Sequence, residues 1–104
     1  MKVFFESAAL IEYREAALYS QQRFGLGEEF VQAVEAAIAV ISSDPGRFQA
    51  LEADIRMFRL PRFPYHIFFL HSPGEDSITV YAVAHHGRQP GYWRGRLRQM
   101  GHPE

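Results

Sequence analysis

Hydrophobic residues recur at helical spacing in the first half of the chain, in two runs that cover residues 7–24 and 28–43. Ser7 is a suitable N-cap for the first run, and a Gly-Leu-Gly segment separates the two. The second run should end before Pro45, because proline cannot continue the hydrogen-bond ladder of a helix. Two helices joined by so short a connection predict an antiparallel helical hairpin.

Each predicted helix has one apolar face that should be buried. The second helix is also apolar outside that face, at Val31, Ala33, Ala36, Ala39 and Val40, so we expect it to be covered on more than one side. The residues expected to be buried are Leu10, Tyr13, Ala17, Ser20 and Phe24 in the first helix, and Phe30, Val34, Ala37, Ile38 and Ile41 in the second.

Strand patterns occupy residues 2–5, 55–60, 65–71 and 77–84, and the last three are separated by proline-containing turns. In the last strand, alternation predicts Ile78, Val80, Ala82 and Ala84 on one face, and Thr79, Tyr81 and Val83 on the other. The order β-α-α-β-β-β predicts an α+β fold in which a helical hairpin packs on a small, mostly antiparallel sheet. We expect residues 1–104 to form a single domain.

Composition narrows the class of protein. The chain of 104 residues is 47% hydrophobic, which is typical of a globular protein rather than a disordered one. It contains no cysteine, so it has neither a disulfide framework nor a thiol nucleophile. No apolar run approaches the ~20 residues that a membrane-spanning helix needs. We therefore expect a cytoplasmic protein with no membrane partner.

Charge is distributed unevenly along the chain, although the net charge is only −1. Residues 1–54 carry 4 basic and 9 acidic side chains, whereas residues 55–104 carry 7 basic and 3 acidic ones and all 5 histidines. The basic side chains of the second half are all arginines, whose planar guanidinium suits phosphate and carboxylate groups. This half is expected to face an anionic partner.

The end of the last predicted strand carries the main candidate site, within residues 81–94. There the strand leads directly into His85, His86, Arg88, Tyr92 and Trp93, with glycine and proline between them. A hydrophobic core does not require such a set, which is more typical of contact with a phosphate, a base or a protein partner. Because His85 and His86 are adjacent, they are expected on opposite faces of the strand.

Other polar residues give weaker signals. His66 and His71 have a spacing seen in metal sites but lack a supporting carboxylate or cysteine, so we expect no metal and no cofactor. Glu12 and Glu15 are expected on the solvated face of the first helix, without paired-carboxylate chemistry.

Four segments in order along the chain resemble one known group of proteins. They are residues 19–30 (YSQQRFGLGEEF), 44–48 (DPGRF), 62–67 (RFPYHI) and 83–93 (VAHHGRQPGYW). Together with the order of strands and helices, they resemble the ParE/RelE toxin superfamily of bacterial type II toxin–antitoxin modules. The resemblance implies a toxin that is neutralised by a cognate antitoxin in a hetero-oligomeric complex.

The superfamily has two branches that differ in target. RelE-like members cleave mRNA on the ribosome, whereas ParE-like members inhibit DNA gyrase. A single lysine and a slightly negative net charge favour the ParE-like branch, because ribosome binding normally uses electrostatic steering. In this interpretation no catalytic residue is assigned, and the residues expected to contact gyrase are Arg56, Arg59, Arg62, Arg88, Tyr92, Trp93 and Arg94.

Two alternatives remain open at the level of sequence. As an mRNA endonuclease, the chain would use His85 or His86 as acid or base, Arg62 and Arg88 as phosphate ligands, and Tyr92 for stacking or proton transfer. It could also be a binding module that keeps the toxin fold without toxicity.

Overall fold

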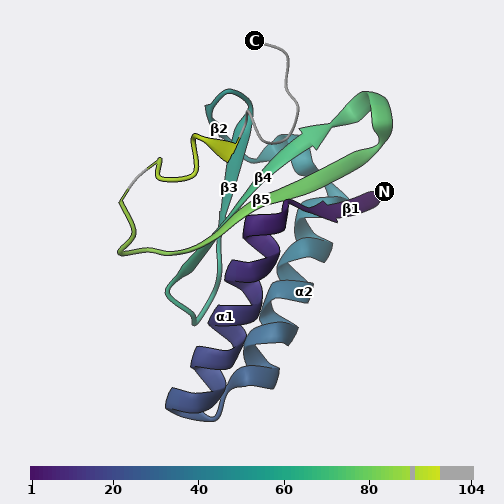
Figure 1. The fold of residues 1–104 in the computed structure, drawn as a ribbon. Coiled ribbons are helices and arrows are strands. Elements are labelled where there is room, and N and C mark those ends of the chain that lie inside the picture. Colours follow the sequence, from purple (N-terminus) through teal and green to yellow (C-terminus); the bar gives the residue numbers. More distant parts are fainter. Residues whose placement is uncertain (90, 97–104) are drawn as a thin grey trace.

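Two antiparallel helices pack against one face of a five-stranded sheet (Figure 1). The computed structural model describes residues 1–89 and 91–96. Its elements are β1 (Lys2–Phe5), α1 (Ser7–Phe24), α2 (Gly27–Ser43), the 3₁₀ turn η1 (Pro45–Arg47), β2 (Ala50–Glu52), β3 (Ile55–Arg59), β4 (Tyr65–Ser72), the 3₁₀ turn η2 (Pro73–Glu75) and β5 (Ser77–His85). The predicted fold is confirmed, with one strand added.

The sheet has the order β1-β5-β4-β3-β2, in which β1 runs parallel to β5 and the other pairs are antiparallel. The added strand is β2, which the sequence did not reveal because its three residues are all exposed and show no alternation. The turn from β2 to β3 places Ala53 and Asp54 at φ values of 48° and 63°, which allows a tight reversal.

The helix-facing core contains buried residues of both helices, of β4 and of β5. From α2 it takes Phe30, Val34, Ala37 and Ile41, which confirms the buried face predicted for that helix, with Ile38 half-buried beside them. From β4 it takes Ile67 and Phe69. This layer holds the hairpin on the sheet, since burial of each large apolar side chain is worth about 1.5–3 kcal/mol.

The other face of the sheet carries a smaller core. It contains Ile55, Tyr81, Ala82 and Trp93, with Phe68, Leu70 and Tyr92 packed against them. Residues 91–96, hereafter the C-terminal segment, therefore cover the face of the sheet that is opposite the helices.

A β-bulge in β5 makes part of the predicted alternation wrong. Phe69 pairs with Val80 and Phe68 pairs with Ala82, so Tyr81 is an extra residue without a partner on β4. After the bulge, each residue of β5 lies on the opposite face of the sheet from the one that simple alternation predicts. Val83 is therefore in the helix-facing core and Ala82 in the smaller core.

The helix ends also differ in part from the prediction. The N-cap of α1 is Glu6 rather than Ser7, because the Glu6 carboxylate accepts hydrogen bonds from the amides of Ala8 (2.7 Å) and Ala9 (3.2 Å). At the other end, Gly25 has a φ of 69° and closes the helix as predicted, since glycine adopts this conformation without strain.

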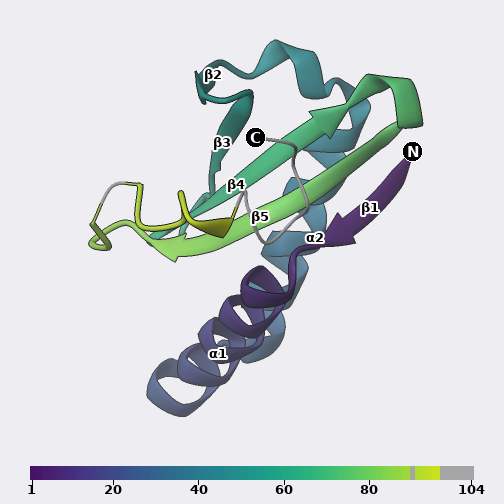
Figure 2. The same ribbon diagram turned by 45° about the horizontal axis from the view of Figure 1, so that its top comes forward.

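The end of the hairpin projects beyond the sheet (Figures 1 and 2). Phe24 lies there and is 61% exposed, so its predicted burial is wrong, whereas Ser20 is buried and Leu10, Tyr13 and Ala17 are half-buried. On α2, the predicted cover over a second side is also wrong within the described residues, because Ala36, Ala39 and Val40 are exposed.

Candidate functional site

Cationic side chains gather at one end of the sheet, where β3 and β5 end and β4 begins. We call this the cationic end, and it consists of Arg59, Arg62, His66, His85, His86 and Arg88. Backbone pairing fixes the arrangement, since Arg59 is opposite His66 and His66 is opposite Ala84, next to His85. The sequence has no carboxylate side chain in residues 55–74 or 77–103, so the strands that form this end contribute no negative charge to it.

His85 and His86 do not lie on opposite faces of a strand, so that prediction is wrong. The strand ends at His85, and His86 is in the following turn, where alternation no longer applies. Their rings stack with centroids 4.7 Å apart. The turn is held by the His86 amide, which donates to the Pro64 carbonyl at 2.9 Å, and by the Gly87 amide, which donates to His85 Nδ1 at 3.0 Å.

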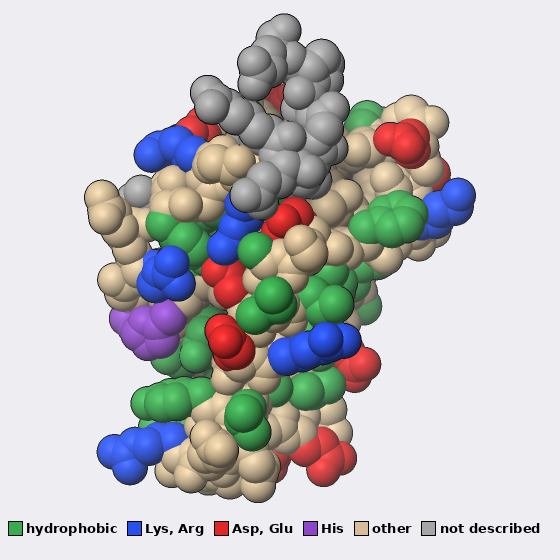
Figure 3. Space-filling model, viewed as in Figure 1, with side chains coloured by type: hydrophobic (Ala, Val, Ile, Leu, Met, Phe, Trp, Pro, Cys, Tyr) green, Lys and Arg blue, Asp and Glu red, His purple; other side chains and the backbone are tan. Residues whose placement is uncertain are grey.

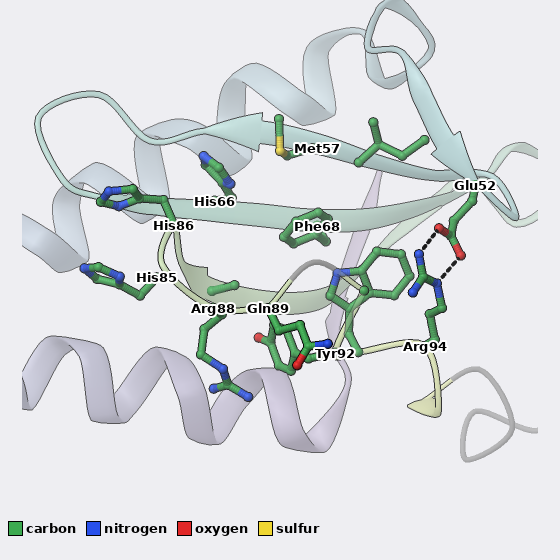
Figure 4. A pocket seen from close by; sticks show the side chains of 14 residues that line it. Glu52, Met57, His66, Phe68, His85, His86, Arg88, Gln89, Tyr92 and Arg94 are labelled. Atoms are coloured by element: carbon green, nitrogen blue, oxygen red, sulfur yellow. Dashed lines mark hydrogen bonds and ion pairs between the residues drawn. The ribbon is translucent and has the colours of Figure 1, made fainter.

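A cavity of about 280 Å³ opens beside this end of the sheet (Figure 4). Its apolar lining includes Met57, Phe68 and Trp93, and its basic lining includes His66, His85, His86 and Arg88. Burial lowers the pKa of His66, and the charges of Arg59 and His86 lower it further, so His66 is favoured in its neutral form.

The residues of the nuclease alternative are only partly brought together. His85, His86, Arg88 and Tyr92 line this cavity, whereas Arg62 lines two other cavities, one beside α2 and one beside the end of the hairpin, and His85 also lines the second of these. Arg62 is in a turn at a φ of 69°.

A half-buried carboxylate that the sequence analysis missed, Glu12, lies at the centre of a hydrogen-bond network. Glu12 does not lie on a solvated face; its side chain is 13% exposed, and both oxygens are hydrogen-bonded. Oε1 accepts from the Val83 amide (3.0 Å) and from Arg96 (2.9 Å), and Oε2 accepts from the Tyr92 hydroxyl (2.7 Å) and from Arg96 (2.7 Å). No signal in the sequence indicated this role, because the burial of Ala9 and Ala16, each one turn from Glu12, is evident only in the structure.

The network shifts the pKa values of its members. Burial alone would raise the pKa of Glu12, but hydrogen bonds from Arg96, Tyr92 and Val83, together with the Arg96 charge, lower it overall. Burial and the hydrogen bond to Glu12 raise the pKa of the Tyr92 hydroxyl, which therefore stays protonated and donates. The hydrogen bond to Glu12 likewise raises the pKa of Arg96.

Several predicted contact residues are engaged within the protein instead. Trp93 is 3% exposed, with its ring 5.3 Å from that of Phe68 and 5.5 Å from that of Tyr81. Arg94 makes two hydrogen bonds of 2.7 Å to Glu52 of β2 (Figure 4). Arg56 donates to the carbonyl of Phe48.

The remaining predicted arginines are exposed. Arg59 and Arg62 lie at the surface, and Arg88 is exposed with its guanidinium 3.8 Å from the centre of the Tyr92 ring. Figure 3 shows histidine beside Lys or Arg side chains at one margin of this view, next to hydrophobic side chains. Among the apolar neighbours of His85 are Tyr19 and Phe24, which line a cavity with it.

Two features are absent from the described part of the chain. Residues 1–89 and 91–96 contain no group of three His, Cys, Asp or Glu side chains placed to hold a metal ion. In the same residues, neither helix combines the length and the apolar character required to cross a bilayer.

Comparison with known proteins agrees with the fold and with the resemblance in sequence. The chain is similar to a chain of the solved structure of the chromosomal ParDE TA system from P. aeruginosa, with a TM-score of 0.70 and 13% sequence identity, over 82% of this chain and 95% of that one. No curated protein sequence gives a match. A family model described as the ParE toxin of type II toxin-antitoxin system, parDE, matches residues 3–90. The chain therefore belongs to the ParE toxin family of type II toxin–antitoxin systems.

Proposed function

We propose that this toxin arrests growth by binding DNA gyrase through its cationic end, and that a cognate antitoxin neutralises it. The observation that carries the proposal is the set of exposed arginines Arg59, Arg62 and Arg88 at one end of the sheet, in a member of the ParE family. Exposed guanidinium groups recognise phosphate and carboxylate groups, and gyrase and its bound DNA offer both.

Fewer residues are proposed to contact gyrase than the sequence analysis predicted. Trp93 is buried in the smaller core, and Arg94 forms an ion pair with Glu52. We therefore propose that these two residues hold the C-terminal segment in place. The ring of Tyr92 packs against the guanidinium of Arg88, and the Tyr92 hydroxyl donates a hydrogen bond to Glu12. The direct contacts in the proposal are Arg59, Arg62 and Arg88, with the neighbouring histidines.

A binding role accounts for this arrangement better than catalysis does. The Tyr92 hydroxyl is committed to Glu12, and its raised pKa disfavours proton release at neutral pH. Arg62 shares a cavity with His85 but not with His86, Arg88 and Tyr92, so the set proposed for a nuclease is divided between two cavities.

The antitoxin is expected on the exposed side of α2. There a largely apolar groove of about 340 Å³ is lined by Ala33, Ala36 and Val40 of the helix and by Phe58 and Pro61 from β3 and its turn. Its polar lining consists of Gln32 and Arg62. An apolar groove beside a helix suits an amphipathic helix of a partner. The presence of an antitoxin in the ParDE system from P. aeruginosa supports such a partner here.

Tightly induced expression of the chain tests the proposed target. We expect growth arrest with loss of negative supercoiling in plasmid DNA and with intact transcripts, and we expect co-expression of the co-encoded antitoxin to restore growth. Arrest with cleaved transcripts and normal supercoiling would contradict the gyrase proposal and favour the endonuclease. Absence of arrest would favour a binding module without toxicity.

A further inference from the structure

We propose that Glu12 is a positioning residue that holds the C-terminal segment on the sheet and thereby orients Arg88 at the cationic end. The carboxylate belongs to α1, whereas its side-chain partners Tyr92 and Arg96 are 80 and 84 residues later in the chain. The part of the inference that concerns Arg88 rests on the proposed function.

The site of attachment is an open edge of β5. The parallel partner β1 pairs only with Ser77–Val80, so among the described residues the rest of β5 has no neighbouring strand on that side. Side chains satisfy this edge instead, because Glu12 accepts from the Val83 amide and Arg96 donates to the Tyr81 carbonyl at 3.0 Å. An exposed strand edge would otherwise be available to pair with another chain.

Hydrogen-bond capacity makes Glu12 specific for this role. Each of its oxygens accepts two hydrogen bonds, so the carboxylate is fully used by the Val83 amide, the Tyr92 hydroxyl and two nitrogens of Arg96. A glutamine of nearly the same shape would replace one accepting oxygen with a donating NH₂ group, which would face donors. Removal of the charge would also leave the 14%-exposed Arg96 without its ion-pair partner.

Tyr92 connects this attachment to the cationic end. Its ring lies between two guanidinium groups, 3.8 Å from Arg88 and 5.1 Å from Arg96. Glu12 fixes the hydroxyl of the same ring, so the face that receives Arg88 is held in one place. The next residue, Trp93, fills the smaller core.

The single tryptophan of the chain gives a direct readout. Trp93 is buried only while the C-terminal segment is attached, so its fluorescence emission should shift to longer wavelength when the segment detaches. Trypsin provides a second readout, because Arg94 and Arg96 lie in the segment itself.

The test compares Glu12→Gln with Glu15→Gln, a substitution of an exposed glutamate on the same helix. For purified Glu12→Gln we expect red-shifted emission, cleavage in residues 88–96 about tenfold faster than in the wild type, and about tenfold weaker inhibition of gyrase supercoiling. Glu15→Gln should match the wild type in all three. Unchanged emission and cleavage in folded Glu12→Gln would overturn the proposal.

Two further controls separate the possible failures. If Glu12→Gln does not fold, as judged by circular dichroism, Tyr92→Phe removes only the hydroxyl bond, and a wild-type cleavage rate in that variant would overturn the proposal. If the wild-type protein does not inhibit gyrase, the proposed function fails, while emission and cleavage still decide whether Glu12 holds the segment.

Discussion

At the residue scale, the same side-chain chemistry has different roles according to its partners. Arg88 and Arg94 are both exposed arginines, but Arg94 is paired with Glu52 and Arg88 lies on the ring of Tyr92. Glu12 and Glu15 likewise lie one turn apart on α1, yet Glu12 is half-buried and accepts four hydrogen bonds, whereas Glu15 is exposed. We therefore expect substitutions at these pairs to separate stability from target binding.

The stability of the protein should depend on pH through Glu12. Because its folded-state pKa lies below the ordinary value of 4.5, the stabilisation is complete above pH 4.5 and is lost as the pH falls through the folded-state value. Arg96 and the Tyr92 hydroxyl, which face the carboxylate, stay protonated in this range, because the pKa of each is raised. The Glu12→Gln variant should be about 2 kcal/mol less stable than the wild type at pH 7.

Urea unfolding at a series of pH values checks this prediction. The difference in unfolding free energy between the wild type and Glu12→Gln should shrink on acidification below pH 4.5. A difference that stays constant down to pH 3 would contradict it.

Trp93 should matter for stability rather than through direct contact with a target. Its 3% exposure predicts that Trp93→Ala lowers the free energy of unfolding by about 3–5 kcal/mol, through the lost burial and the cavity that remains. Arg88→Ala, at an exposed position, should change it by less than about 0.5 kcal/mol. Denaturant unfolding of the two variants measures both values, and equal effects would contradict the assignment of Trp93 to the core.

At the element scale, α2 uses its two sides differently. One side packs in the helix-facing core through Phe30, Val34 and Ile41, while the exposed side presents Ala36 and Val40 beside β3. The sheet covers the helix from one direction only, so the exposed apolar residues are available to a partner. This geometry makes the proposed antitoxin interface separable from the fold.

Val40→Lys tests that separation. Val40 is 37% exposed near the C-terminal end of α2, where a cation is favourable for the helix, so the stability should stay within about 0.5 kcal/mol. Affinity for the co-encoded antitoxin, measured by calorimetry, should fall at least about tenfold because a charge enters an apolar contact. Gln22→Lys on α1 adds the same charge at another exposed position, and an equal loss of affinity there would contradict the proposed groove.

At the scale of the whole molecule, features set by neighbouring residues could be predicted from the sequence, whereas features set by distant contacts could not. The helices, their break at Gly25 and four of the five strands could be predicted, because periodicity and glycine are local signals. The bulge at Tyr81 could not, because alternation in the sequence continues through it. Glu12 could not be assigned either, since its role depends on partners 71 to 84 residues away.

The candidate site was predicted in location but not in detail. Arg59, Arg62 and Arg88 were identified from the charge asymmetry, and the structure places them at the surface at one end of the sheet. Burial of Trp93 and pairing of Arg94 with Glu52 required knowledge of how the C-terminal segment folds back. Composition shows which side chains are available, whereas the tertiary contacts decide which are exposed.

The most direct measurement is gyrase supercoiling in vitro with the purified wild-type chain and two matched variants. Arg59→Ala/Arg88→Ala removes two charges from the cationic end, and Arg14→Ala/Arg23→Ala removes two exposed charges from α1. We predict inhibition by the wild type and the α1 variant, and at least about tenfold weaker inhibition by the cationic-end variant at equal stability. Equal inhibition by both variants, or none by the wild type, would contradict the account.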